Sequence, residues 1–490
     1  MENGWIRINV KGSPYDAGYA HGSLVATDLK EIMTALEFIV PDGFGFSLTE
    51  LSNLMYDLLS PIVIENYPDI MKEIEGITKG AQDNGFTELT IIKVFFWNCW
   101  YSVGYLISDL PLLIENNIDL LKKHGYMFDT LKRSKNIKGG AKDKCTGFIA
   151  LGDWTKDGKI VCGHNTFDNY IDSQFANILL LITPDKGNSF IMQTSPGQVC
   201  SGTDYYVSSN GFIVTETTIG GFNQFALKNP LFCRIRQAVQ YSKTLEDYST
   251  YLQDGNSGDY ANSWLIGDTI NNEIMRIELG LNQVNVERKK NGYFIGFNAP
   301  YDQKIRNLEC VNSGFYDIRR HQGARRVRLE QLMIEHKGKL DIKIGQAILA
   351  DHYDVYLNKV NPCSRTCCSH YDLDQREFMS QSDRPFPFQP RGALDGIVSD
   401  TTLAKNMGLS ARWGSSCGMA FDAAKFCDRN IQWRAQKPYL KDRPSVPWTT
   451  FTGIQPESNN TTRTNKVGVA KGGKGTKAKR RTKRVLVRRS

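Results

Sequence analysis

The sequence lacks the features that would anchor or export a chain, and it lacks a balanced set of cysteines. Its first residues contain an early acid, Glu2, and no apolar core or small-residue cleavage site, so they do not resemble a signal peptide. The most hydrophobic window, 91–114, contains Lys93 and Pro111, which predicts a buried helix and no transmembrane segment. Eleven cysteines, an odd number, argue against a disulfide framework and for mostly reduced thiols.

Acidic residues are absent from the last stretch, 458–490, which holds 12 of the 60 lysines and arginines. The whole chain carries +8, whereas residues 1–457 hold 48 basic and 52 acidic residues, a net charge of −4. The tail has no apolar periodicity, so we expect it to be disordered. It is either a solvated end or a segment that makes nonspecific contact with polyanions.

Spacings typical of metal sites are missing as well. Cys363, Cys367 and Cys368 cluster in the sequence, but no second cysteine pair follows at zinc-finger spacing, so no metal and no cofactor is predicted. Residues 414–418 match the pattern G-x-S-x-G with Ser416 in the nucleophile position. The preceding residues, 407–412, predict a poor strand, which favours a Gly/Ser turn there.

What is present divides the chain into three parts. Residues 1–144 form a helical N-terminal region that ends in a polar, Gly-containing linker at 134–144. Residues 145–457 begin with short strand-like runs separated by turns, and helical patterns return at 229–253 and 321–351. This order predicts an α+β fold, with an antiparallel sheet domain carrying helices on its faces. The basic tail is the third part.

Cys145 opens the first of these strands directly after the linker. A predicted hairpin turn at Asp157-Gly158 returns the chain to the segment 163–168. Paired strands would therefore bring His164 and Asp168 beside the thiol of Cys145. The alternative is that Cys145 is a small buried core residue, as most cysteines are.

With these residues the chain resembles the phospholipase B-like family, within the wider N-terminal-nucleophile hydrolases that include bile-salt hydrolases and penicillin acyltransferases. The resemblance rests on blocks in a fixed order along the body: Cys145-Thr146-Gly147, Gly163-His164-Asn165-Thr166, residues 208–218 and 260–266, Asp351-His352-Tyr353-Asp354, Gly392-Ala393-Leu394-Asp395-Gly396 and Arg412-Trp413-Gly414.

The resemblance implies a four-layer αββα sandwich and self-processing between Lys144 and Cys145. The Cys145 thiol would attack the carbonyl of Lys144, and water would then release the ester. The new α-amino group, with a reference pKa of about 7.7–8.0, can serve as the general base for its own thiol. Such a chain needs no separate catalytic histidine.

The resemblance also implies further site residues. Asp168 matches the carboxylate that orients the nucleophile, or it is a turn-forming Asp. His164 is expected as a polar active-site partner, or as a structural residue. Asn262 and Thr218 match oxyanion-hole positions, with strand-entry and strand-propensity roles as the alternatives. Arg325 matches an active-site arginine, unless its run 323–328 is a solvated basic helix face.

The sequence therefore predicts a cysteine hydrolase that cleaves an acyl bond, ester or amide, in an acylated small molecule or a phospholipid. Two alternatives stay open. One is an acyltransferase on the same fold, and the other is a catalytically idle scaffold whose basic tail binds nucleic acid or an anionic surface. The family is usually lysosomal or secreted, and no signal peptide is seen here, so the compartment is open.

Overall fold

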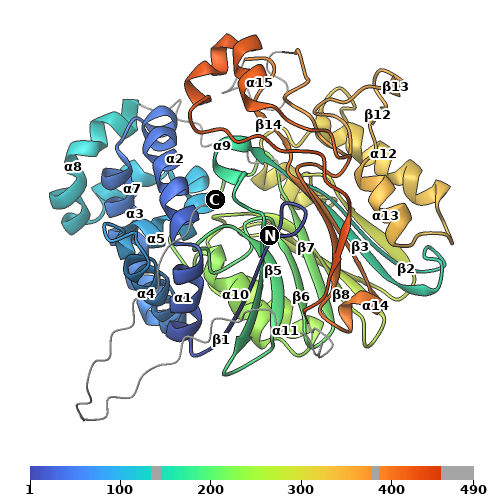
Figure 1. The fold of residues 1–490 in the computed structure, drawn as a ribbon, viewed down its shortest axis with the longest axis horizontal. Coiled ribbons are helices and arrows are strands. Elements are labelled where there is room, and N and C mark those ends of the chain that lie inside the picture. The colour runs from blue at the N-terminus through green and yellow to red at the C-terminus, as the bar shows by residue number, and fades with distance from the viewer. Residues whose placement is uncertain (134–144, 377–385, 454–490) are drawn as a thin grey trace, which may run out of the picture. The chain divides into compact units, whose positions relative to one another are not determined.

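Two β-sheets lie face to face at the centre of the computed structural model, which describes residues 1–133, 145–376 and 386–453 (Figure 1). Helices α10 (Leu231–Tyr241) and α11 (Leu245–Gln253) pack on strands of the first sheet, and α12 (His321–Glu335) and α13 (Ile342–Leu349) pack on strands of the second. The layers follow the order helix, sheet, sheet, helix. The predicted αββα architecture is confirmed.

The first sheet has eight strands, in the order β1-β4-β5-β6-β7-β8-β9-β10. β1 runs parallel to β4, and every other neighbouring pair is antiparallel. The strands are β1 (Ile6–Gly12), β4 (Ile178–Pro184), β5 (Phe190–Thr194), β6 (Tyr205–Ser208), β7 (Phe212–Thr218), β8 (Asn262–Asp268), β9 (Glu273–Leu279) and β10 (Val284–Lys289).

The second sheet has the order β11-β2-β3-β15-β16-β17, and β14 also pairs with β3. All its pairs are antiparallel. The strands are β2 (Cys145–Gly152), β3 (Gly158–Asn169), β11 (Gly292–Gly296), β14 (Arg391–Ala393), β15 (Asp395–Asp400), β16 (Leu409–Trp413) and β17 (Thr449–Phe451). A separate two-stranded ribbon joins β12 (Tyr353–Asp354) to β13 (Lys359–Val360).

Helices dominate the N-terminal region as predicted, and Figure 1 shows them gathered at one side of the sheets. Among the helices of the described chain, none has the length and apolar character of a membrane span. The remaining helices are α1 (Pro14–Leu24), α2 (Ala26–Phe44), α3 (Leu48–Asn66), α4 (Pro68–Asp83), α5 (Ile91–Asn98), α6 (Trp100–Leu106), α7 (Leu110–Glu115), α8 (Ile118–Arg133), α9 (Tyr170–Ser173), α14 (Thr401–Ala404) and α15 (Ala423–Arg429), with a π-helical turn at Ile305–Glu309 and a 3-10 turn at Ile431–Gln436.

Glycines allow α1 and α4 to cross at close range. A β-carbon on Gly18 would lie 2.1 Å from the carbonyl oxygen of Glu73, and one on Gly22 would lie 2.0 Å from that of Ile77. Gly76 and Gly80 of α4 make equally close approaches to the backbone of α1. Any larger residue at these positions would force the two backbones apart.

The N-terminal strand β1 is a feature that the sequence analysis missed. Ile6, Ile8 and Val10 alternate with polar residues, which is the period of a half-buried strand. The strand extends the first sheet by pairing in parallel with β4, and Trp5 before it packs edge-on against Trp413 of the second sheet at 5.4 Å between ring centroids. The N-terminal region is thereby built into the sheets.

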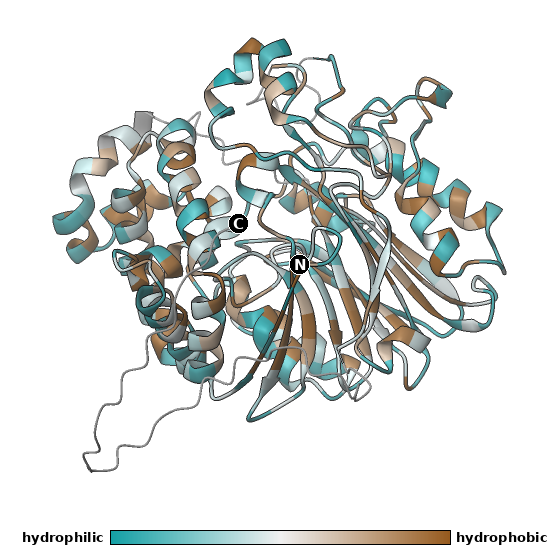
Figure 2. Cartoon of the chain, viewed as in Figure 1, coloured by the Kyte–Doolittle hydropathy of each residue, from teal (hydrophilic) through white to brown (hydrophobic). Residues whose placement is uncertain are grey.

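Alternating residues of β2 and β3 face two different cores. Ile149 and Cys162 belong to the large cluster shared with the first sheet, whereas Phe148 and Val161 pack in a second cluster with residues of α12 and α13. Figure 2 shows the hydrophobic residues concentrated along the central strands and on the helix faces that cover them. β2, which starts at Cys145, is therefore buried on both faces.

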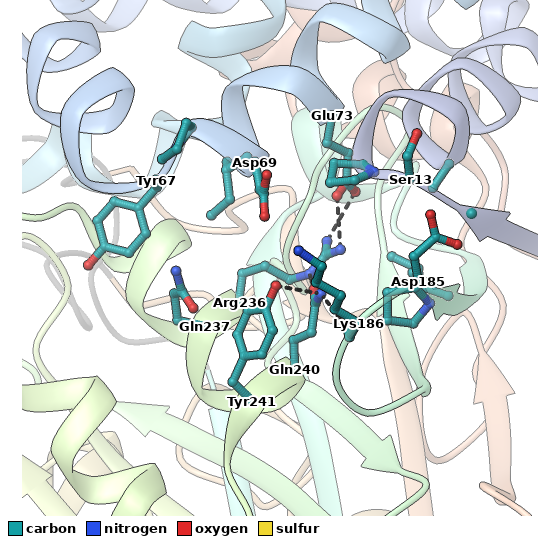
Figure 3. A pocket seen from close by; sticks show the side chains of 17 residues that line it. Ser13, Tyr67, Asp69, Glu73, Asp185, Lys186, Arg236, Gln237, Gln240 and Tyr241 are labelled. Carbon is teal, nitrogen blue, oxygen red and sulfur yellow. Dashed lines mark hydrogen bonds and ion pairs between the residues drawn. The ribbon is translucent and has the colours of Figure 1, made fainter.

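A buried ion pair joins the helical region to the sheet region. Arg236 of α10 makes two hydrogen bonds to the carboxylate of Glu73 of α4, at 3.0 and 2.8 Å, and its guanidinium lies 5.0 Å from the ring centroid of Phe190. Figure 3 shows this pair at the wall of an open pocket that Tyr67 and Tyr241 also border. The pocket's lining includes none of the predicted catalytic residues.

Replacing Arg236 with Met is expected to lower the free energy of unfolding by about 3–5 kcal/mol, because Glu73 would remain buried without its partner. Lys72 lies on α4 beside Glu73 and forms an exposed pair with Glu75. Lys72→Met breaks that pair and should change stability by less than about 1 kcal/mol. Urea unfolding of both variants measures the difference. Equal losses in the two would contradict this role of the buried pair.

Candidate active site

Cys145 is the first residue of β2 and is fully buried, opposite Thr166 of β3. Its backbone N–H donates a hydrogen bond to Oδ1 of Asn298 at 3.2 Å. Its carbonyl oxygen accepts a hydrogen bond from the guanidinium of Arg325. The backbone of Cys145 is thus fixed on both sides of its Cα atom. Its predicted cleavage partner, Lys144, lies outside the described residues, as do the linker 134–144 and the basic tail 458–490.

Arg325 reaches this site from α12 and has no exposed surface. Besides the carbonyl of Cys145, it contacts Oγ1 of Thr146 at 3.1 Å and Oδ1 of Asn298 at 2.7 Å. Its guanidinium lies 5.1 Å from the ring centroid of Phe167. Burial rules out the solvated-face alternative for this residue. The arginine instead positions the Cys145 backbone and the Asn298 amide together.

The ends of β7 and β8 bring Thr218 and Asn262 opposite each other, and both are fully buried. Asn298 connects this pair to Cys145, because its Nδ2 donates to the carbonyl of Thr218 at 2.8 Å while its Oδ1 accepts from Cys145. The Thr218 hydroxyl also contacts the hydroxyl of Tyr260 at 2.9 Å. The Asn298 side chain therefore links one predicted oxyanion-hole residue, Thr218, to the nucleophile candidate, and the other, Asn262, is the strand partner of Thr218.

Two carboxylates flank the thiol. One ligand atom each from Cys145, Asp204 and Glu216 lie within 4.8 Å of one another. The Tyr260 hydroxyl lies between the carboxylates, 3.2 Å from Oε1 of Glu216 and 3.3 Å from Oδ2 of Asp204, and it can donate its one proton to either. Burial, followed by the charges of Asp204 and Glu216, raises the pKa of Tyr260, so this hydroxyl stays protonated. Carboxyl groups this close to a thiol provide a favourable place for a positively charged neighbour, such as an α-ammonium group.

Asp168 lies on β3, two residues beyond the strand partner of Cys145, and it is buried. Its Oδ1 accepts a hydrogen bond from the backbone N–H of Asn169 at 2.8 Å. Burial first, and then the charges of Asp168, Asp172 and Asp204, raise the pKa of Tyr101. Asp168 therefore acts on the same phenol as Asp204, at the end of the sheet where the thiol lies.

His164 lies opposite Gly147 of β2 and is fully buried. Burial lowers its pKa to about 3. A histidine with such a pKa is neutral at physiological pH and is a weak proton acceptor. Its surroundings favour the structural alternative that the sequence analysis gave for this residue, and they are compatible with a mechanism that needs no catalytic histidine.

His164 and Asp395 should affect the pH dependence of stability in opposite directions. With its lowered pKa, His164 adds stability that is complete above about pH 6.5 and is lost as the pH falls toward 3. Burial raises the pKa of Asp395 to about 7, so its stabilisation is complete below about pH 3.9 and is lost as the pH rises through 7.

Urea unfolding at pH 5 and pH 7.5 tests this pair of effects. We expect His164→Gln to gain about 2 kcal/mol at pH 5 relative to pH 7.5, compared with the wild type, and Asp395→Asn to lose about 2 kcal/mol in the same comparison. The readout is the difference between the two pH values, so an overall loss of stability does not obscure it. Variants with the same pH difference as the wild type would contradict both assignments.

Sequence reasoning missed Asn298, Asp204 and Glu216 at this site. Asn298 stands two residues after strand β11 and two residues before a proline, and its φ is positive, 66°, which Asn tolerates better than most residues. Glu216 is a lone carboxylate inside an otherwise uncharged, fully buried strand. The proline that follows Asn298 and the isolated Glu216 could be read in the sequence, whereas nothing adjacent to Asp204 there points to Cys145.

Ser416, the rival nucleophile, has different surroundings. The preceding strand β16 exists, so the prediction of a poor strand there was wrong; its edges are held by pairing with β15 and β17. No helix begins directly after Ser416, as a nucleophile elbow requires. Its hydroxyl donates to the carbonyl of Leu349 at 2.6 Å and accepts from Asn165 at 3.0 Å. Ser416 is a buried residue whose hydrogen bonds link its loop to α13 and β3.

The chain, an αββα fold with a buried cysteine at the start of a central strand, is similar to known proteins. A family model described as Phospholipase B matches residues 65–442, and the chain belongs to the phospholipase B family. The predicted family is thereby confirmed.

Curated relatives are about a quarter identical to the chain over the residues that align. An uncharacterized protein of Archaeoglobus fulgidus is 26% identical over 273 residues, and a phospholipase B of Crotalus adamanteus is 28% identical over 240 residues. These matches cover 53% and 43% of this chain but only 40% of each relative, so the chain spans less than half the length of either. Phospholipase-B 81 of Drysdalia coronoides is 27% identical over 475 residues, and this match covers 82% of this chain and 78% of that relative.

Among solved structures, a mutant of conjugated bile acid hydrolase from Clostridium perfringens matches with a TM-score of 0.31 and 11% sequence identity. The match covers 55% of this chain and 89% of that chain.

Proposed function

We propose that the chain is a self-processing cysteine hydrolase that cleaves an acyl bond, ester or amide, with Cys145 as the nucleophile. The observation that carries this proposal is the placement of Cys145. It is the first residue of a central strand, its backbone is held by Asn298 and Arg325, and its thiol lies beside Asp204 and Glu216. Membership of the phospholipase B family supports a hydrolase.

In the processing step, the Cys145 thiol attacks the carbonyl carbon of Lys144. The C–N bond between the two residues breaks, the thiol proton passes to the nitrogen, and a thioester joins Lys144 to the sulfur. Water then hydrolyses the thioester, which frees the Lys144 carboxylate and restores the thiol. The hydrogen bond from Arg325 to the Cys145 carbonyl holds the new N-terminal residue in place during both events.

In turnover, the freed α-amino group accepts the thiol proton, and the sulfur attacks the acyl carbon of the substrate. The leaving amine or alcohol takes that proton, and water hydrolyses the acyl-thioester. Asp204 and Glu216, within 4.8 Å of the sulfur, stabilise the α-ammonium form that arises when the amine holds the proton. Asp168 is proposed to orient the same amine.

Asn262 and Thr218 are proposed as donors to the oxyanion that develops on the acyl oxygen. Each such donor is worth about 10²–10³ in kcat where it is positioned before the reaction. Asn298 sets the distance of Thr218 from the nucleophile, since its side chain bonds both the Thr218 carbonyl and the Cys145 N–H.

The two products of self-cleavage would stay associated. Residues before Lys144 supply strand β1 to the first sheet and Glu73 to the buried ion pair with Arg236. They also supply Trp5, which packs on Trp413 across the sheets. Cleavage in the linker removes none of these contacts.

The substrate proposal is tested with one acyl chain presented in three forms: a phospholipid, a simple ester and an N-acyl amide. The purified chain, whose fragments are checked by mass, is expected to release the free acid from at least one form and to show a transient acyl adduct on Cys145. A second arm adds a primary amine. Transfer of the acyl group to that amine in preference to water would assign an acyltransferase. No turnover of any form by a processed chain with a titratable thiol would contradict the hydrolase.

A further inference from the structure

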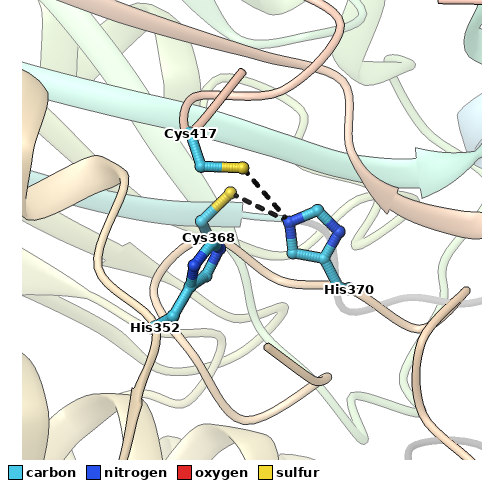
Figure 4. A group of neighbouring side chains, drawn as sticks. All are labelled: His352, Cys368, His370 and Cys417. Carbon is cyan, nitrogen blue, oxygen red and sulfur yellow. Dashed lines mark hydrogen bonds between the residues drawn. The ribbon is translucent and has the colours of Figure 1, made fainter. Parts of the chain in front are cut away.

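Four side chains with metal-binding atoms meet outside the candidate active site: His352, Cys368, His370 and Cys417 (Figure 4). One ligand atom from each lies within 4.8 Å of those from the other three. Nε2 of His370 is 3.4 Å from Sγ of Cys368 and 3.4 Å from Sγ of Cys417. The residues come from three separate loops, and only Cys368 and His370 lie close together in the sequence.

We propose that these four residues hold a structural Zn²⁺ ion. Two thiolates and two imidazoles are a common ligand set of structural zinc. Tetrahedral bonds of about 2.3 Å to sulfur and about 2.0–2.1 Å to nitrogen place sulfur and nitrogen about 3.5 Å apart. Both sulfur distances from Nε2 of His370, 3.4 Å, agree with that geometry. Thiolate ligands disfavour the hard cations Mg²⁺ and Ca²⁺.

Groups around the cluster orient its members in the way that a metal site requires. Oδ1 of Asp372 lies 3.3 Å from Nδ1 of His370, which leaves Nε2 facing the two sulfurs. The backbone N–H of Met419 donates to Sγ of Cys417 at 3.4 Å, as amides do to metal-bound thiolates. Nε2 of His352 is buried and makes no hydrogen bond to any of the described residues, which a bound cation would explain.

The cluster supplies four protein ligands and is mostly enclosed, which fits a structural ion. Cys368 and His370 are buried, and His352 and Cys417 are partly buried. A catalytic zinc would keep one position open for water. No step of the proposed acyl chemistry needs this ion, so the proposal of a zinc site is independent of the proposed role of Cys145.

The position of the cluster suggests what the ion stabilises. Cys368 packs with Phe167 of β3 in a small core, and Phe167 lies under the guanidinium of Arg325. From the same strand, Asn165 donates to the carbonyls of Leu349 and Cys367, each at 3.0 Å. The ion would therefore fix three loops against the strand that pairs with β2.

Metal analysis of the full chain, purified under reducing conditions and then dialysed against buffer with trace zinc, tests the proposal. We expect about one zinc ion per chain. Cys368→Ser and Cys417→Ser should each lose most of it, whereas Cys310→Ser, a thiol outside the cluster, should retain it. A wild-type chain that takes up no zinc under these conditions would overturn the proposal.

Two measurements keep the test independent of whether the cysteine variants fold. Loading the wild-type chain with Co²⁺ should give the visible bands of tetrahedral cobalt and a thiolate-to-cobalt charge-transfer band. Asp372→Asn, which keeps all four ligands, should weaken zinc binding by about 10–100-fold. A Cys368–Cys417 disulfide in the reduced preparation, seen as a mass lower by two hydrogens, would overturn the metal site in favour of a covalent link.

Discussion

Replacing Cys145 with Ala is expected to leave the chain uncut after Lys144 and to reduce acyl-bond hydrolysis by roughly 10³-fold or more. The variant has no sulfur to attack the Lys144 carbonyl, so the α-amino group that serves as general base is never released. Both losses have one cause, and they should appear together. The measurements are the intact mass of the purified variant and its turnover of the acyl substrate that the wild type accepts.

Cys310→Ala is the matched control for this variant, because Cys310 is a cysteine that does not belong to the group formed by Cys145, Asp204 and Glu216. It should be processed and active like the wild type. The Cys145→Ala chain should fold, since alanine fits the space of a fully buried cysteine with a small loss of packing. Processing of Cys145→Ala at the wild-type rate, or full turnover by it, would exclude this residue as the nucleophile.

Arg325→Lys is expected to lower kcat by about 10²-fold while the chain still folds. Lysine keeps the charge but cannot span the Cys145 carbonyl, Thr146 and Asn298 at once, as the guanidinium does. A displacement of the nucleophile by about 1 Å costs roughly 10²-fold in rate. Since Arg325 acts on substrate only through Cys145 and Asn298, kcat should fall more than KM rises.

The neighbouring Arg326 provides a matched control on the same helix. Its guanidinium is half-buried and bonds to Glu330 and to the carbonyl of Phe315, away from Cys145. Arg326→Lys should retain kcat within about twofold. Equal effects of the two substitutions on kcat would show that Arg325 supports the helix and has no positioning role at the nucleophile.

The α+β class could be predicted from local patterns because most elements are regular and bounded by turn residues, whereas the four-layer αββα arrangement was implied by the family resemblance. The hairpin through Asp157-Gly158 formed as expected and set Cys145 opposite Thr166. β1 was missed because its alternation of Ile6, Ile8 and Val10 is short and its partner β4 is far away in the sequence. A parallel pairing between segments so far apart in the sequence cannot be recognised from the residues of either segment alone.

The candidate site was only partly predictable. Cys145, Asn262 and Thr218 stand in segments whose resemblance to a family carried their roles, and the fold brings them together. Asn298 and Glu216 join them through contacts across layers that no single segment encodes. His352, Cys368, His370 and Cys417 illustrate the same limit: only C-x-H lies close in sequence, and the other two ligands are supplied by the folding of distant loops.

The most direct test of the central claim is the intact mass of the wild-type chain after purification, together with the N-terminal sequence of its fragments. We expect two associated pieces, one of which begins at Cys145 with a free thiol and a free α-amino group. A chain that stays whole after incubation at mildly acidic and neutral pH, or one cut elsewhere and active, would contradict it.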